Sequence, residues 1–196
     1  MTEWQPQDHY FRRAKKEGFI ARSVYKLEEV DRRVRLLRTG QRVLDLGCHP
    51  GSWLQYCARA VGKRGLVVGV DTHRISIELP PHVHFIQADV FELLPADVYP
   101  ISDEFDVVLS DLAPATTGIS SVDSSRSFAL FQRALTLSDD LLIPGAHFLG
   151  KIFQGSGFDE MVKKLKSRFG KVKIIKPRAT RSQSKEIYLV AMGKKA

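Results

Sequence analysis

The residues best placed to do chemistry in this chain lie between two predicted strands. The apolar run Val43-Leu44-Asp45-Leu46 leads into the turn Gly47-Cys48-His49-Pro50-Gly51, and a helix is predicted from Ser52. A second apolar run, 66–70, ends at Asp71. Glycines in such a turn let a ligand approach the backbone, and an acid about 20 residues further on accepts hydrogen bonds from a ribose diol. The pattern therefore predicts a site that binds a nucleoside.

The turn differs from the loop that binds dinucleotides. A G-x-G-x-x-G loop needs glycines where Cys48-His49-Pro50 stands, and a bulky turn that contains proline fits a pyrophosphate poorly. A ligand with a ribose but without phosphates fits better, and S-adenosylmethionine is the common ligand of that kind. The motif alone is compatible with a methyltransferase and with another Rossmann-like domain.

Acids occur at the ends of four successive predicted strands. Asp45 lies at the end of the first strand, and Asp71, Asp89 and Asp111 follow the next three. In an open α/β sheet, ligands bind outside the carboxyl ends of the strands, so these acids are expected to surround one site. They would repel one another unless a ligand supplied hydrogen-bond donors and positive charge. A ribose diol, an adenine amine and a sulfonium-bearing amino acid would supply both.

The hydrophobic pattern predicts strands that alternate with helices, which is typical of a parallel sheet. The last two strands are joined by a connection too short for a crossover helix, so they are expected to pair antiparallel. The predicted fold class is α/β and Rossmann-like, with a mostly parallel sheet, an antiparallel last strand and helices on both faces. Residues 1–19 are expected to form a basic N-terminal arm, mobile or helical, before a single domain at 20–196. Strands are predicted at 42–46, 66–70, 83–87, 105–110, 146–153, 171–176 and 186–191, and helices from Ser23 to Gly40 and at 52–61, 91–94, 126–142 and 158–168.

The net charge of +8 is unevenly distributed along the chain. Residues 1–38 hold ten Lys and Arg against six acids, residues 151–196 hold thirteen against three, and residues 39–150 hold seven against thirteen. Two basic ends around an acidic core predict that both ends fold to one face and bind a polyanion such as RNA. The alternative is that solvated lysines are scattered over the helices. The arginines expected to contact RNA are Arg12, Arg13, Arg22, Arg32, Arg33, Arg35, Arg178 and Arg181.

Composition argues against several other classes of protein. No apolar run approaches the roughly 18 residues that suggest a membrane span, and residues 1–6 lack the apolar core of a signal peptide, so a cytoplasmic protein is expected. The two cysteines, Cys48 and Cys57, are expected to be reduced thiols. Neither they nor the histidines have the spacing of a metal site, so no metal is expected. The protein is expected to be a monomer.

Five segments, in order, resemble motifs of the FtsJ-like RNA 2′-O-ribose methyltransferase family, and the resemblance covers about residues 8–194. The segments are 22–27, 45–53, 110–114, 151–155 and 184–188. The resemblance implies the S-adenosylmethionine-dependent form of the Rossmann-like fold, with S-adenosylmethionine as cofactor. It supplies the family's lysine–aspartate–lysine–glutamate tetrad as Lys26, Asp111, Lys151 and Glu186. Cofactor contacts are expected from Asp45, Gly47, Pro50, Gly51, Ser52, Trp53, Asp71, Asp89, Val90 and Asp111.

The tetrad suits methylation of a ribose hydroxyl, which is a poor nucleophile and must lose its proton as the methyl group arrives. A free lysine has a pKa near 10.4, so keeping one neutral at pH 7 costs about 4–5 kcal/mol unless burial or a nearby cation lowers that pKa. Lys151 is the expected proton acceptor. As a cation it would instead steer and stabilise the developing alkoxide, and the sequence leaves both roles open. Alignment of the hydroxyl, the methyl carbon and the sulfur supplies the rest of catalysis.

The cofactor turn departs from the family pattern at three positions. Two small residues usually precede its proline, where this chain has Cys48 and His49, and Ser52 replaces the family's second glycine. His49 would either crowd the methionine part of the cofactor or point outward.

Two other classes of function fit the sequence less well. A NAD(P)-dependent oxidoreductase would need the missing G-x-G-x-x-G loop, and an inactive RNA-binding module would lack part of the tetrad, which is complete here. Within the family, compact single-domain chains resemble those that act on a uridine of 23S ribosomal RNA, in the A-loop that holds the A-site tRNA. Relatives that modify tRNA or mRNA caps are the alternative.

Overall fold

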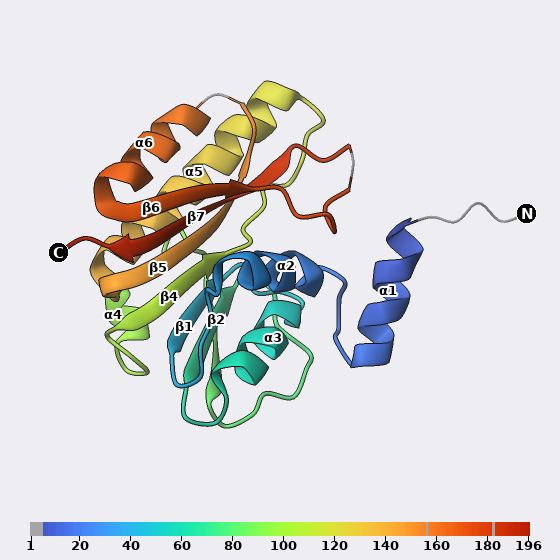
Figure 1. Ribbon diagram of the computed structural model, residues 1–196, viewed down its shortest axis with the longest axis vertical. Coiled ribbons are helices and arrows are strands. Elements are labelled where there is room, and N and C mark those ends of the chain that lie inside the picture. The colour runs from blue at the N-terminus through green and yellow to red at the C-terminus, as the bar shows by residue number, and fades with distance from the viewer. Residues whose placement is uncertain (1–5, 156, 182) are drawn as a thin grey trace, which may run out of the picture.

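The computed structural model describes residues 6–155, 157–181 and 183–196. It contains a seven-stranded sheet in the order β3-β2-β1-β4-β5-β7-β6 (Figure 1). Strand β7 runs antiparallel to both of its neighbours, and the other strand pairs are parallel. The strands are β1 Arg42–Leu46, β2 Leu66–Asp71, β3 Val83–Gln87, β4 Phe105–Ser110, β5 Leu142–Phe153, β6 Phe169–Ile175 and β7 Glu186–Lys194. The predicted α/β fold class is therefore confirmed.

Helices cover both faces of this sheet (Figure 1). Helices α2 and α3 pack on one face through Leu27 and Leu54, and α5 and α6 pack on the other through Phe131 and Leu165. The central strands are buried on both sides, which is why they read as continuous apolar runs. The helices are α1 Pro6–Glu17, α2 Val24–Val34, α3 Ser52–Val61, α4 Pro95–Val98, α5 Ser120–Leu141 and α6 Phe158–Arg168.

Helix α2 ends earlier than predicted. Its apolar spacing continues to Leu37 and predicted a helix up to Gly40, but the helix ends at Val34. Arg35 has a left-handed backbone with φ 55°, and its N–H donates to the carbonyl of Asp31. The Asp31 carboxylate accepts the N–H of Leu37 at 2.9 Å. This bond between side chain and backbone competes with a further helical turn, and Leu37 is still buried.

Helix α5 begins before the predicted start at residue 126. The Ser- and Thr-rich sequence predicted a loop up to that point, whereas the helix starts at Ser120. Asp123, in the first turn, accepts hydrogen bonds from the preceding loop. The hydroxyl of Ser127 accepts the N–H of Phe153 at 3.0 Å. Small polar side chains therefore bond the start of α5 to the preceding loop and to β5. The Ser- and Thr-rich composition alone does not reveal these contacts.

Other boundaries differ as well: β6 covers Phe169–Ile175 rather than 171–176, and β7 continues to Lys194 rather than to residue 191. Residues 91–94 are not helical, and the short helix α4 starts instead at Pro95, whose fixed φ suits a first helical position. Asp97 caps α4 by accepting the N–H of Leu94 at 2.8 Å. Strand β5 starts at Leu142 rather than at residue 146, with a register irregularity against β4.

The helical form of the N-terminal arm is the one observed. Helix α1 lies at the edge of the molecule beside α2 (Figure 1), and residues 1–5 of the arm lie outside the described residues. Ala14 is buried, and the rings of Tyr10 and Tyr25 lie 5.4 Å apart, so α1 packs on the start of α2. In the described part of the chain, no helix is both long and apolar enough to cross a bilayer.

Candidate active site

Three adjacent strands place predicted catalytic residues side by side. Asp111 directly follows β4, and the register of β4 with β5 pairs Ser110 with Gly150, so Asp111 lies beside Lys151. The next strand, β7, pairs Tyr188 with Lys151. The order β4-β5-β7 therefore brings together side chains that are far apart in the sequence.

Lys151 and Asp111 form a buried ion pair. The Lys151 side chain is 5% exposed, and its Nζ lies 3.0 Å from Oδ1 of Asp111 and 2.7 Å from the backbone oxygen of Asp111. The Tyr188 hydroxyl donates to the same Oδ1 at 2.6 Å. Burial alone would raise the pKa of Asp111, but the charges of Lys151 and Lys26 and the hydrogen bonds from Tyr188 and Lys151 lower it below its ordinary value. Asp111 is therefore an anion that fixes the Lys151 ammonium group.

A second ion pair completes the tetrad. Lys26 on α2 places its Nζ 2.5 Å from Oε1 of Glu186, and both side chains are largely buried. The hydroxyl of Thr180 donates to the same Oε1 at 3.2 Å. The structure thus brings together all four predicted tetrad residues, two positive and two negative. The role of each remains a prediction.

Tyr188 and Thr180 had no predicted role in the site. Tyr188 lies two residues after Glu186 on β7, and alternate residues of a strand point to the same face, so this spacing was the available signal. Burial and the nearby charges of Asp111 and Glu186 raise the pKa of Tyr188 well above its ordinary value. Its hydroxyl therefore stays protonated and acts as a donor. Thr180 lies in a loop, where no comparable periodicity exists.

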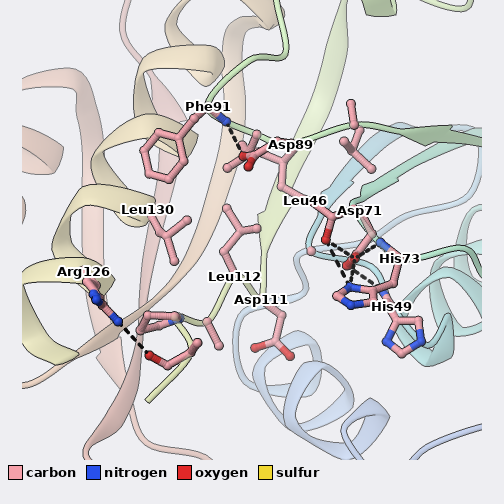
Figure 2. Close-up of a pocket in the computed structure, with 18 of the residues that line it drawn as sticks. Leu46, His49, Asp71, His73, Asp89, Phe91, Asp111, Leu112, Arg126 and Leu130 are labelled. Atoms are coloured by element: carbon pink, nitrogen blue, oxygen red, sulfur yellow. Dashed lines mark hydrogen bonds and ion pairs between the residues drawn. The ribbon is translucent and has the colours of Figure 1, made fainter. Parts of the chain in front are cut away.

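A cavity of about 510 Å³ opens at the carboxyl edge of the sheet, beside Asp111 (Figure 2). Its volume is typical of sites for small molecules. Four other predicted cofactor residues line it, namely Gly47, Asp71, Asp89 and Val90. The strand-end acids Asp71, Asp89 and Asp111 therefore share one cavity, as expected for acids at the carboxyl ends of parallel strands.

Side chains without a predicted role line the same cavity. Figure 2 shows Phe91, Leu130 and Arg126 along one side and Asp71 along the other. Arg126 donates to the carbonyl of Ala115 at 3.3 Å and so holds the loop that follows Asp111. Arg126 and Leu130 are four residues apart on α5 and share one helix face, but the sequence does not reveal that this face lines a cavity together with the segment that follows β3.

Asp71 organises the two loops on its side of the cavity. Its carboxylate accepts the N–H of His49 and the N–H of His73, both at 2.9 Å. The two imidazole rings lie 5.3 Å apart (Figure 2). His49 is exposed at the wall of the cavity, so the departure from the family pattern adds an imidazole to this wall. In the described residues, no group of three or more His, Cys, Asp and Glu side chains could hold a metal ion.

Half of the predicted cofactor residues do not line this cavity; these are Asp45, Pro50, Gly51, Ser52 and Trp53. Ser52 and Trp53 attach the turn to the start of α2. The hydroxyls of Ser52 and Ser23 share a hydrogen bond of 2.8 Å, and the indole N–H of Trp53 donates to the Ser23 carbonyl at 3.0 Å. Ser23 stands where the helix was predicted to begin, and its side chain makes no capping bond to α2.

The backbone of the turn requires glycine at two positions. Gly47 has φ +80°, and a Cβ on it would lie 3.0 Å from the backbone nitrogen of Leu112. Gly51 has φ +113°, and a Cβ there would lie 2.6 Å from Ile77 Cδ1. Residues other than glycine rarely adopt such angles. Gly47 also lines the cavity, and its bare backbone beside Asp71, Asp89 and Asp111 fits a cofactor that carries a nucleoside.

Asp45 is a buried acid without a partner in the described structure. It is 0% exposed, and neither carboxyl oxygen has a hydrogen-bond partner. Burial raises its pKa well above the ordinary value, and the negative charges of Asp111 and Asp71 raise it further. The Asp45 carboxyl group therefore keeps its proton up to a higher pH in the folded chain than in the unfolded chain.

This raised pKa predicts how stability depends on pH. An acid whose pKa is higher in the folded state stabilises that state below its unfolded pKa, near 3.9, and the stabilisation is lost as the pH rises through the folded value. We expect Asp45→Asn to unfold at a higher temperature than the parent protein at pH 8, and the difference to shrink toward pH 4. Thermal unfolding across this range, with the exposed Asp103→Asn as control, measures it. A difference independent of pH would contradict the raised pKa.

Four of the eight arginines predicted to bind RNA line a cavity where three segments meet, namely Arg13, Arg32, Arg33 and Arg178. Ion pairs link Arg13 and Arg32 to Glu28 on α2, and the backbone N–H of Arg178, in the β6–β7 connection, donates to Glu29 at 2.6 Å. The lysine-rich helix α6 packs on the opposite face of the sheet. The prediction that both basic ends share one face is therefore wrong for α6, because that helix must cover the other side of the core. The arginines lie on α1 (Arg12, Arg13), at or beside α2 (Arg22, Arg32, Arg33, Arg35) and in the β6–β7 connection (Arg178, Arg181).

Comparison with known proteins identifies relatives over nearly the whole chain. A model of the FtsJ-like methyltransferase family matches residues 19–194. The chain is 51% identical to "Ribosomal RNA large subunit methyltransferase E" of Desulfatibacillum aliphaticivorans, over 96% of this chain and 91% of that protein. It is 48% identical to the protein of the same name from Syntrophobacter fumaroxidans, over 95% of each chain.

Two solved structures share the fold. A ribosomal RNA methyltransferase of Plasmodium falciparum matches with a TM-score of 0.79 and 27% identity, over 90% of this chain and 98% of that chain. Fibrillarin of Aeropyrum pernix, in complex with S-adenosyl-L-methionine, matches with a TM-score of 0.55 and 16% identity, over 80% and 68% of the two chains. The family model spans the tetrad and the cofactor turn alike. The chain therefore belongs to the FtsJ-like methyltransferase family.

Proposed function

We propose that this protein methylates the 2′-hydroxyl of a uridine in 23S ribosomal RNA, in the A-loop of the large subunit, with S-adenosylmethionine as methyl donor. The observation that carries the proposal is the buried Lys151–Asp111 pair beside the cavity at the sheet edge. The two relatives compared above are both named for large-subunit ribosomal RNA. We further propose that the protein acts as a monomer in the cytoplasm. A tRNA or an mRNA cap is the alternative substrate.

Lys151 is the proposed group that handles the proton of the ribose hydroxyl. Its ammonium contacts two oxygens of Asp111, and an ammonium has three donors, so one remains for a substrate oxygen. As a cation it orients the hydroxyl and stabilises the negative charge that develops there; as a neutral amine it accepts the proton. Asp111 holds the nitrogen in place in either case, and Tyr188 holds Asp111.

The cavity residues are proposed to hold the cofactor, which supplies an electrophilic methyl group when it is bound. Asp71 is the proposed acceptor for its ribose diol, and Asp89, across the strand ends, is the proposed contact of its adenine. Asp71 is held by two backbone N–H groups and is only 13% exposed. Asp89 accepts the N–H of Phe91 at 2.9 Å, which fixes the acid beside the aromatic ring (Figure 2).

Replacing Asp71 with alanine should weaken S-adenosylmethionine binding about tenfold or more, because buried ribose hydroxyls would lose their acceptor. Asp71→Asn keeps one acceptor oxygen and should lose less. Isothermal titration calorimetry of both variants measures the effect, with the exposed Asp103→Ala as control. An affinity unchanged from wild type in folded Asp71→Ala would contradict the assignment.

The proposed substrate can be tested with tritium-labelled S-adenosylmethionine. Total RNA and intact 50S subunits from a strain that lacks its own family enzyme are incubated with the protein, and the label is located by fractionation and nuclease mapping. The proposal requires label on one uridine ribose of 23S ribosomal RNA. Label in the tRNA fraction would support the alternative substrate, and label on a base rather than a ribose would exclude 2′-O-methylation.

A further inference from the structure

A second cavity, of about 360 Å³, lies outside the cofactor site. Its walls come from α1, from the outer face of α2 and from the β6–β7 connection. Tyr10 and Tyr25 supply its aromatic surface, and Arg13, Arg32 and Arg178 are among its basic groups. The proton-transfer role proposed for the tetrad does not use this cavity.

The aromatic surface of this cavity rests on a buried ring. The Tyr25 ring is 3% exposed and contacts two side chains of α1, because the Tyr10 ring is 5.4 Å away and the Arg13 guanidinium is 4.3 Å from its centroid. The Tyr25 hydroxyl donates to Glu17 at 3.2 Å. Tyr10 is only partly buried, so it is the ring that a ligand in the cavity can reach. A flat aromatic ring backed by a fixed one suits a planar ligand.

The charges of the cavity favour an anion. Four guanidinium groups and two carboxylates line it, so it carries net positive charge. Glu28 pairs with Arg13 at 3.3 Å and with Arg32 at 2.7 Å, which holds both arginines toward the same place. Arg32 is 69% exposed, and exposed ion pairs of this kind are weak, so a phosphate can compete for its guanidinium.

The cavity adjoins the tetrad through two short connections. Tyr25 is followed directly on α2 by Lys26. Arg178 is two residues before Thr180, which donates to Glu186. Tyr25 and Arg178, which line the cavity, are thus close in sequence to Lys26 and to the Thr180 that contacts Glu186. A ligand in this cavity and the occupant of the tetrad would therefore be bound by neighbouring residues of the same two segments.

We propose that this cavity binds the base and phosphate of a nucleotide near the methylated one in the RNA. The base stacks on Tyr10, and its phosphate contacts Arg32 and Arg178. Bases that are splayed out of a loop are commonly recognised by stacking on aromatic rings and arginines. The inference rests on the proposed function, since it takes the occupant of the tetrad to be a ribose of RNA.

The test combines protein variants with RNA that lacks single bases. A fragment that spans the methylated loop is prepared with an abasic residue at each position that flanks the target, one position at a time. Binding to wild type should weaken about tenfold at one position, through the loss of one stacked base. Tyr10→Ala should bind the intact RNA about tenfold more weakly and should lose nothing further at that same position. Tyr10→Phe keeps the ring and should behave as wild type.

Two controls separate stacking from folding. Phe11→Ala removes a neighbouring ring of α1 that is 61% exposed and does not line the cavity, so RNA affinity should not change. Tyr10→Leu keeps apolar contact with Tyr25 but has no aromatic face, and it should reproduce the Tyr10→Ala pattern. Circular dichroism and cofactor affinity report whether α1 and the domain remain folded.

Each outcome separates this proposal from the proposed function. If Tyr10→Leu lowers affinity equally for intact RNA and for every abasic RNA, the ring contacts no base and the inference is wrong. If Phe11→Ala has the same effect as Tyr10→Ala, the loss reflects α1 alone and the inference is wrong as well. If wild type transfers no methyl group to any RNA, the proposed function fails, whatever the binding pattern shows.

Discussion

Replacing Lys151 with alanine should slow methyl transfer about 100-fold or more in a single-turnover assay, which is within the usual range for a group that handles a proton. The Lys151 side chain is 5% exposed within an apolar sheet, and its Nζ contacts a carboxylate oxygen and the backbone oxygen of Asp111. A lysine buried in this way does not serve as a solvated surface charge. Its removal should leave cofactor and RNA affinities within a few-fold, because the missing interaction belongs to the transition state.

Lys151→Arg should not restore the rate. A guanidinium keeps its proton near neutral pH, and its planar shape does not fit a pocket built around one nitrogen. The matched control is Lys171→Ala, which removes an exposed lysine from β6 in the same sheet. It should transfer methyl groups at the wild-type rate.

Stability has to be measured alongside the rate, because Asp111 loses a cation in the alanine variant. Removing one partner of a buried ion pair typically costs about 3–5 kcal/mol. Assays therefore belong well below the unfolding temperature of Lys151→Ala, with cofactor affinity as the check on folding. A folded variant that methylates RNA at close to the wild-type rate would show that Lys151 serves the fold rather than the reaction.

The sequence predicted the strands more accurately than the helix ends, for a physical reason. A strand buried on both faces needs a continuous apolar run, and that run ends where the buried strand ends. Helix ends depend on local competition for backbone groups, as when the Asp31 carboxylate takes the N–H of Leu37 and ends α2. The start of α5 depends on contacts with residues far away, such as the bond from Phe153 to Ser127. Such contacts have no periodic signature in the sequence.

The site likewise contains residues that a local sequence pattern predicts and residues that only contacts between distant segments bring together. Strand-end acids could be expected in one cavity because parallel strands share a carboxyl edge, and three of them line it. The tetrad itself came from the family resemblance, since no local pattern says that Lys26 on a helix meets Glu186 on the penultimate strand in the sheet order. Asp45 lies on the other side of β1 from Leu44 and Leu46, and this alternation explains why it is buried away from the cavity.

Asp111→Asn should be nearly as damaging as Lys151→Ala, with a loss of about 100-fold in the rate of methyl transfer. The substitution keeps the size of the side chain but removes the negative charge that orients the Lys151 ammonium at 3.0 Å. It also leaves the Tyr188 hydroxyl with a weaker acceptor. Glu186→Gln is the matched comparison, because it removes the other carboxylate of the tetrad without changing its shape. It should cost less, since Glu186 contacts Lys26 and Thr180 rather than Lys151.

The pH dependence of stability gives an independent check on Asp111. Its pKa is lowered in the folded protein, so the ionised carboxylate stabilises the fold above the unfolded pKa, near 3.9, and this contribution is lost as the pH falls through the lower folded value. Asp111→Asn has no such group, and its unfolding temperature should fall less steeply than that of wild type below pH 4. If Asp111→Asn keeps the wild-type rate and Glu186→Gln does not, the two carboxylates have exchanged the roles assigned to them, and the proton is handled at Lys26 rather than at Lys151.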